Sequence, residues 1–178
     1  STFAPCGLSG IINRLTVFTK IIVSSQKGFL MYKNFNAGAI GIRNYSLEDT
    51  IKLAKQTGFA GVDFDLAEAT KLANDKGIES VKKLFSDNGI LPGAWGPPVN
   101  WREDEAKWKS DLQALPEHAG VAAELGALRA STWIMPSSAD RDFDANYAFH
   151  AERLGAIAEI LKPHNIRFGL EFIGPQTL

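Results

Sequence analysis

One carboxylate stands out by its position in the chain. Glu171 is the single acidic residue of the apolar stretch 166–175, which ends at Gly174-Pro175. The stretch predicts a short buried strand that carries Glu171 near its C-terminal end. An ionised carboxylate is costly to bury unless a cation or hydrogen-bond donors meet it there. Arg167 lies on the same face but roughly 13 Å away along an extended strand. The pattern therefore predicts a bound metal ion or a polar substrate at Glu171.

Other side chains suited to chemistry follow the other predicted strands. Asp63 and Asp65 share side-chain parity, so both can point to one face, although one of them could simply cap the following helix. Trp95 and Trp133 are either core filling or walls of a pocket. Aromatic walls with a few carboxylates are typical of a site for a small polyol or sugar, because flat rings cover C–H faces while acids receive hydroxyl groups.

Three further groups of residues are more ambiguous. Trp101 lies in a proline-rich loop where a tryptophan is costly to expose, which favours a lid or an interface. Arg43 either binds an anionic substrate group, with help from Ser137 and Ser138, or lies in solvent. The three histidines fall within or just after predicted helices, which favours surface positions over metal ligation: they are His118, His150 and His164.

The elements that position these residues repeat along the chain. Four helix-ending residues, Gly58, Gly89, Gly126 and Asn165, each precede an apolar strand, at intervals of 31, 37 and 39 residues. The predicted strands are 37–42, 59–65, 90–95, 128–135 and 166–173, and the predicted helices are 47–57, 68–88, 104–125 (kinked or broken near Pro116) and 144–162. Strands and helices that alternate at this period predict βα units and a parallel sheet.

Two parallel-sheet architectures fit this alternation, an open doubly wound sheet and a barrel. No glycine-rich phosphate loop follows any strand, so the nucleotide-binding form of the open sheet loses support. Five eighths of a (β/α)₈ TIM barrel is roughly 156 residues, close to the length of 31–178. We therefore predict an α/β fold, a TIM barrel truncated after strand five. In such a barrel the C-terminal ends of all five strands face the same mouth, and Glu171 lies at one of these ends.

Composition narrows the class of protein. Cys6 is the only cysteine, which excludes an intramolecular disulfide and favours the cytoplasm. Residues 1–30 contain three basic residues and no acid, and without them the charge of −1 becomes −4. Residues 31–178, with this negative net charge, are not expected to bind nucleic acid electrostatically. No apolar run in the sequence is long enough to span a membrane. We interpret 1–30 as an N-terminal extension outside the fold, with Met31 as a natural start. A targeting peptide, or an additional strand or helix, are the alternatives for this segment.

A resemblance becomes specific at three motifs. They are Gly58-Phe59-Ala60-Gly61-Val62-Asp63, the stretch Trp95-Gly96-Pro97-Pro98, and above all Gly169 to Pro175. Together they resemble the xylose-isomerase-like TIM barrels, and within them the sugar phosphate isomerase/epimerase group. The resemblance covers the chain from about Phe35 to Leu178.

The resemblance implies a divalent metal at the barrel mouth, Mn²⁺, Mg²⁺, Co²⁺ or Zn²⁺, with Glu171 as a ligand and as acid/base. It implies that the remaining ligands follow Leu178, so that the fragment alone is inactive. The expected reaction is isomerisation or epimerisation of a sugar or sugar phosphate by proton transfer next to a carbonyl. Candidate substrate-binding residues are Asp63, Asp65, Trp95, Trp101, Trp133 and Arg43.

Other functions remain open at this stage. An inositol-type dehydratase or lyase would use the same metal site. A DNA endonuclease acting at apurinic sites is less well supported, because it would need histidines at early strand ends, where this sequence has none. An inactive half-barrel or binding module would expose unpaired strand edges and would be expected to form a homo-oligomer.

Overall fold

The computed structural model describes residues 31–102 and 104–174. The described residues from Lys33 onward belong to one compact unit. The predicted N-terminal extension, 1–30, lies outside the described residues. No helix in the described part of the chain is long and apolar enough to cross a membrane.

The described residues contain five parallel strands that follow one another in chain order. They are β1 (Asn34–Phe35), β2 (Gly61–Val62), β3 (Leu91–Pro92), β4 (Arg129–Ile134) and β5 (Arg167–Phe172). β1, β2 and β3 form one sheet and β4 pairs with β5 in another. A parallel bridge between Trp95 and Ala130 connects the two sheets. The order 1-2-3-4-5 with a helical connection between successive strands is that of the first five strands of a TIM barrel.

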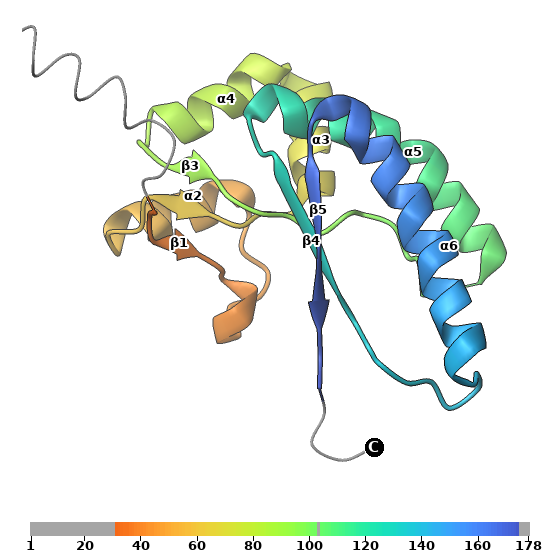
Figure 1. Ribbon diagram of the computed structural model, residues 1–178. Helices are drawn as coiled ribbons and strands as arrows, with labels where there is room; N and C mark the ends of the chain where they lie inside the picture. The colour runs from red at the N-terminus through yellow and green to blue at the C-terminus, as the bar shows by residue number, and fades with distance from the viewer. Residues whose placement is uncertain (1–30, 103, 175–178) are drawn as a thin grey trace, which may run out of the picture. The chain divides into compact units, whose positions relative to one another are not determined.

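Helices fill the connections between strands (Figure 1). They are α2 (Leu47–Gln56), α3 (Leu66–Lys76), α4 (Ile78–Ser86), α5 (Glu105–Leu125) and α6 (Phe143–Leu161), with 3₁₀ turns η1 (Gly38–Ile40) and η2 (Lys162–His164). Side chains of Ser46, Asp65, Asp104 and Asp142 cap the first turns of α2, α3, α5 and α6. The predicted N-cap at Ser46 is confirmed.

The residues predicted to end helices also adopt the expected backbone conformation. Gly58, Gly89 and Gly126 have φ of 73°, 65° and 75°, and Asn165 has φ of 56°. This left-handed conformation lets a backbone N–H reach back to the last free carbonyls of the helix, and it favours glycine or asparagine. The pattern of caps therefore identified each turn from helix to strand correctly.

The first predicted strand, 37–42, is wrong. β1 lies earlier, at Asn34–Phe35, and Gly38–Ile40 form η1 instead. The side chain of Asn36 accepts a hydrogen bond from the Ala39 backbone N–H, at 2.9 Å, which starts the turn. Small residues have low strand propensity and bury little apolar area, so this local hydrogen bond decides the conformation. β2 and β3 are also shorter than predicted.

Two helix predictions also need correction. The predicted helix 68–88 is two helices, α3 and α4, separated at Gly77, whose φ of 81° interrupts the helical backbone. α5, by contrast, runs without a break from Glu105 to Leu125 although Pro116 lies inside it. A proline removes one backbone hydrogen bond of a helix, and tertiary packing can compensate. Leu115 and Ala119, on either side of Pro116, are fully buried.

The core consists of two apolar clusters. One centres on α2, α3, α4 and the first strands and includes Ile51 and Val62. The other lies between α5, α6 and β4 and includes Trp108 and Ile157. Figure 1 shows α5 and α6 beside β4 and β5. These two clusters fix the strands whose ends carry the candidate site.

β5 is not the buried strand that its apolar sequence predicts. Among its residues only Phe168 is even partly buried. β5 pairs with β4 along one edge, and no described strand pairs with its other edge. Its outward-facing residues Phe168, Leu170 and Phe172 line an apolar groove against α6. The inward face of β5, which carries Glu171, is therefore open.

Candidate functional site

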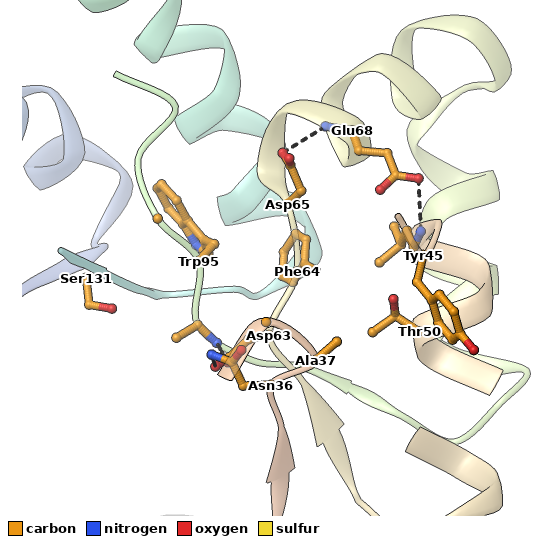
Figure 2. A pocket seen from close by; sticks show the side chains of 14 residues that line it. Asn36, Ala37, Tyr45, Thr50, Asp63, Phe64, Asp65, Glu68, Trp95 and Ser131 are labelled. Carbon is orange, nitrogen blue, oxygen red and sulfur yellow. Dashed lines mark hydrogen bonds between the residues drawn. The ribbon is translucent and has the colours of Figure 1, made fainter. Parts of the chain in front are cut away.

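A pocket of about 310 Å³ lies at the C-terminal ends of β1, β2 and β3 (Figure 2). Its walls come from the segments that follow these strands, from α2 and α3, and from the middle of β4. The lining residues are Asn36, Ala37, Gly38, Tyr45, Leu47, Thr50, Asp63, Phe64, Asp65, Glu68, Ala94, Trp95, Gly96 and Ser131. Three of the predicted site residues, Asp63, Asp65 and Trp95, are thus brought together.

Asp63 connects the first three strands. Its Oδ1 accepts hydrogen bonds from the Asn34 side chain and from the Ala94 backbone N–H, the latter at 2.7 Å. Its Oδ2 accepts one from Asn36 Nδ2 at 3.1 Å. A carboxylate offers about four acceptor positions, so these bonds leave about one for a ligand. The structure therefore gives Asp63 a positioning role first.

Gly93 allows this arrangement because the chain passes very close to it. A Cβ atom at Gly93 would lie 2.5 Å from Asn34 Oδ1, 2.7 Å from Asp63 Oδ1 and 2.7 Å from the Val62 carbonyl oxygen. No side chain fits at such distances without moving backbone. A glycine after β3 therefore lets Asp63 reach the next strand.

Asp65 is the N-cap of α3. Its Oδ1 accepts hydrogen bonds from Ala67 N at 2.8 Å and Glu68 N at 3.2 Å. Glu68 in turn accepts a hydrogen bond from Leu47 N through Oε1, at 2.9 Å, so it connects α3 to α2. Figure 2 shows both contacts at one end of the pocket. One oxygen of each carboxylate, Asp65 Oδ2 and Glu68 Oε2, has no described hydrogen-bond partner and remains available.

Trp95 is both a core residue and a pocket wall. Its side chain is 2% exposed, and its indole N–H donates to the Ala127 carbonyl at 2.8 Å. Its backbone bonds to Arg129 and Ser131 of β4. Ser131, which no sequence motif marks as a site residue, closes the same wall from the neighbouring strand.

Glu171 lies on the inner face of the sheet beside Trp133. The register of β4 and β5 pairs Ser131 with Gly169 and Trp133 with Glu171. Residues that pair directly share a face, so Glu171, Trp133 and Ser131 face the same side, opposite the helices. The side chain of Glu171 is exposed and has no hydrogen bond or ion pair with the described residues. Two residues along the strand place it roughly 7 Å beyond the level of Ser131 and the pocket.

Trp101 and Trp133 occupy different environments. Trp101 is 4% exposed and packs against Phe149 and His150 of α6, so it is a core residue beneath the loop rather than a lid. Trp133 is 43% exposed on the inner face of β4. Arg102 lies between the two rings. The sequence offered no signal for Arg102, because the two tryptophans are far apart in the chain.

Arg43 is exposed and does not line the pocket. Ser138, its suggested partner for an anion, accepts a hydrogen bond from Asp140 N at 3.2 Å within its own loop. The structure thus does not bring Arg43 together with the other predicted site residues.

The histidines are half-buried rather than surface residues. His118 Nδ1 lies 2.8 Å from Thr70 Oγ1, which connects α5 to α3. His150 packs edge-on against Trp101. Burial lowers the pKa of His150, and the nearby positive charges of Arg102 and Arg141 lower it further. His164 lies in η2.

Several lining residues were missed by sequence reasoning. Asn36 follows β1 directly, but the predicted strand 37–42 concealed that position. Glu68 could have been found, because Asp65-Leu66-Ala67-Glu68 resembles a capping box. Tyr45 and Ser131 carry no local signal of a site.

The donor set limits what metal chemistry the described residues can support. No group of three or more His, Cys, Asp and Glu side chains in the described part of the chain could hold a metal ion. Glu171, exposed and without a partner, fits one ligand position. Asp63 fits poorly, because neutral donors already occupy most of its acceptor positions. The described residues therefore do not fit a complete metal site.

Comparison with solved structures gives the fold directly. A xylose isomerase domain protein from Alicyclobacillus acidocaldarius is 27% identical with a TM-score of 0.71, over 83% of this chain and 52% of that one. The IolI protein with a bound zinc atom is 18% identical with a TM-score of 0.63, over 81% and 52%. D-psicose 3-epimerase with D-fructose is 16% identical with a TM-score of 0.58, over 78% and 51%.

The chain spans about half the length of these solved structures. Among proteins with curated descriptions, none matches it significantly. Residues 51–178 match the family described as xylose isomerase-like TIM barrel, which confirms both the predicted fold and the resemblance. Two of the solved structures with this fold are named as a D-psicose 3-epimerase and a D-tagatose 3-epimerase-like protein. On this match and on the order of its strands, the chain belongs to the xylose isomerase-like TIM barrel family.

Proposed function

We propose that the protein containing this chain is a sugar isomerase or epimerase, in which Glu171 transfers a proton at a carbon next to a carbonyl. The observation that carries the proposal is the position of Glu171 at the C-terminal end of β5, on the inner face beside Trp133. Its carboxylate has no hydrogen-bond or ion-pair partner among the described residues. TIM-barrel enzymes place their catalytic groups at this end of the strands. Solved relatives named as epimerases support the reaction class.

In this proposal, the residues of the candidate site have the following roles. Glu171 takes the proton from the carbon and returns it, while the electron pair of the C–H bond moves toward the carbonyl oxygen. The exposed ring of Trp133 covers one face of the sugar. Asp65 Oδ2, Glu68 Oε2 and the Ser131 hydroxyl receive substrate hydroxyl groups, and Trp95 forms a wall. Asp63 holds the three strand ends in register and offers its remaining acceptor position.

We also propose that Glu171 is one ligand of a divalent cation in the whole protein, with the other ligands outside the described residues. The zinc-bound relative supports this part of the proposal. Such a cation would polarise the substrate carbonyl when bound.

The first test measures proton transfer without knowledge of the product. The full-length protein is incubated in D₂O with uncharged ketohexoses and with ketose phosphates, and exchange at the carbons next to the carbonyl is followed by NMR. We expect exchange with wild type and its loss in Glu171→Gln. The control is Glu152→Gln, which removes an exposed carboxylate of α6. Equal exchange in Glu171→Gln and wild type would refute the assigned role.

The second test is calorimetry with Mn²⁺ on the same proteins. We expect wild type and Glu152→Gln to bind one cation and Glu171→Gln to bind it much more weakly. Unchanged binding in Glu171→Gln would show that Glu171 is not a ligand, while the exchange assay would still decide its role in proton transfer.

A further inference from the structure

Arg102 is held between two tryptophan rings beside the C-terminal end of β4. Its guanidinium carbon lies 3.9 Å from the ring centroid of Trp101 and 4.0 Å from that of Trp133. Its Nη2 donates a hydrogen bond to the Trp133 backbone carbonyl. Stacking on both faces leaves the planar guanidinium able to bind only through its edges. One edge contacts the carbonyl, and the other N–H groups remain available.

The loop that carries Arg102 is fixed from beneath. The Trp101 indole N–H donates to Thr132 Oγ1 at 3.3 Å, and the Trp101 carbonyl accepts a hydrogen bond from Arg153 Nη1 at 2.9 Å. Arg153, on α6, is 7% exposed and also contacts Glu105 of α5 at 3.1 Å. Arg102 therefore has its orientation before any ligand arrives, which lowers the entropic cost of binding.

The charge of Arg102 is not neutralised by the described residues. Their Asp and Glu side chains form ion pairs with Lys52, Lys82, Lys107, Lys109, Arg153 and Lys162, but not with Arg102. Burial lowers the pKa of Arg102, because the guanidinium loses part of the water around it. Two positive charges, those of Arg102 and Arg141, lower the pKa of nearby His150. The local field therefore favours an anion.

Trp133 relates Arg102 to the proposed catalytic group, Glu171. Trp133 stacks on Arg102 and pairs with Glu171 across β4 and β5. Among the described residues, the guanidinium and the Glu171 carboxylate form no ion pair with each other. A substrate that covers the Trp133 ring could contact Glu171 at one end and Arg102 at the other.

From this arrangement we propose that Arg102 and Trp133 form a binding subsite for an oxyanion, the phosphate or carboxylate end of a sugar-like substrate whose reacting carbon lies at Glu171. The subsite deepens the proposed function and rests on it for the orientation of the substrate. In this proposal Arg102, which the fold immobilises, binds the anion instead of Arg43, for which the sequence analysis suggested that role. A planar guanidinium with free N–H groups matches both kinds of oxyanion.

The test uses inorganic phosphate and acetate as probes on the full-length protein, without sugar or metal. Affinity is measured by calorimetry for wild type, Arg102→Gln, Arg102→Lys and the control Arg43→Gln. We expect wild type and Arg43→Gln to bind at least one probe equally well, and Arg102→Gln to bind it at least about tenfold more weakly. Arg102→Lys should show an intermediate loss, because it keeps the charge but not the planar fork.

A second readout separates binding from a merely structural role of Arg102. An anion at Arg102 should raise the pKa of His150, followed by NMR in the presence and absence of the probe, because it offsets a positive charge that acts on this histidine. Thermal unfolding of each variant verifies that it is folded. A folded Arg102→Gln that binds the probes as well as wild type, or wild type that binds neither, would overturn the proposal.

The outcomes also separate the subsite from the proposed function. Exchange of uncharged ketohexoses in D₂O depends on Glu171 and requires no oxyanion, so exchange in the wild-type protein tests the proposed function by itself. Stronger binding of phosphate would assign a phosphorylated substrate, and stronger binding of acetate would assign a carboxylate. If the wild-type protein exchanges ketohexose protons but binds neither phosphate nor acetate, only the oxyanion subsite is refuted. If it binds a probe through Arg102 but shows no exchange, the isomerase activity is refuted.

Discussion

Asp63 and Glu171 occupy corresponding places in the fold, at the C-terminal ends of β2 and β5, but their surroundings differ. Asp63 accepts hydrogen bonds from Asn34, Asn36 and Ala94, and these contacts connect three strands. Glu171 is exposed and has no such contacts with the described residues. The carboxylate of Asp63 is thus used to hold the strands together, whereas the carboxylate of Glu171 remains available for reaction.

The comparison predicts opposite consequences for the two carboxylates. The largest effect is expected for Glu171→Gln on turnover of the full-length protein. Loss of a general acid/base should lower kcat by on the order of 10²–10⁴-fold. The free energy of unfolding should change little, because the side chain is exposed. Steady-state kinetics and urea unfolding check both parts, and a large loss of stability would show that Glu171 has a structural partner.

Asp63→Ala should have the reverse signature. The variant leaves the Ala94 N–H and two asparagine amides without their charged acceptor. We expect a loss of about 3 kcal/mol in the free energy of unfolding, since hydrogen bonds to charged groups are worth about 1.5–3 kcal/mol. Urea denaturation measures the loss. A variant that is as stable as wild type but inactive would place Asp63 with Glu171 and remove the contrast.

Asp65→Ala is expected to be milder. It removes the N-cap of α3, whose backbone N–H groups at Ala67 and Glu68 lose their acceptor. Such caps contribute about 1 kcal/mol. Asp65→Asn is the matched comparison, because an amide oxygen still caps while the charge is lost. If Asp65→Asn retains stability but raises KM for the sugar, the second carboxylate oxygen binds substrate, as proposed.

The smallest effect concerns pH. Burial, with Arg102 and Arg141 nearby, lowers the pKa of His150. The folded state therefore favours neutral His150. Its contribution to stability is fully present above the ordinary histidine pKa of about 6.5 and is lost as the pH falls through the lower folded value. Unfolding by urea at a series of pH values should show a smaller acid loss in His150→Gln than in wild type. Identical pH profiles would contradict the assignment.

Much of the fold could be predicted because its signals are local. Gly58, Gly89, Gly126 and Asn165 end helical segments by their backbone conformation, and each is followed by a strand. Where a local signal was weak, the prediction failed. The segment 37–42 became a 3₁₀ turn through the side chain of Asn36, and a helix was divided at Gly77.

The candidate site was less predictable, because partners decide what each side chain is free to do. The strand period placed Glu171 correctly near the C-terminal end of β5, but its expected burial depended on neighbours that the described residues do not supply. Trp101 was predicted as a lid or interface and is a core residue, because α6 covers it. Asp65 proved to be a cap, one of the two readings that its position allowed.

The sequence by itself determined the alternation of strands and helices, the turns between them and the strand end that carries Glu171. Periodicity and capping act over a few residues, so they can be read along the chain. Only the tertiary structure decided which carboxylate is occupied and which cation is immobilised. Asp63 meets its partners across 27, 29 and 31 residues of sequence, and Arg102 meets the Trp133 carbonyl across 31. Contacts at such separations depend on how the strands pair and stack, which no local pattern encodes.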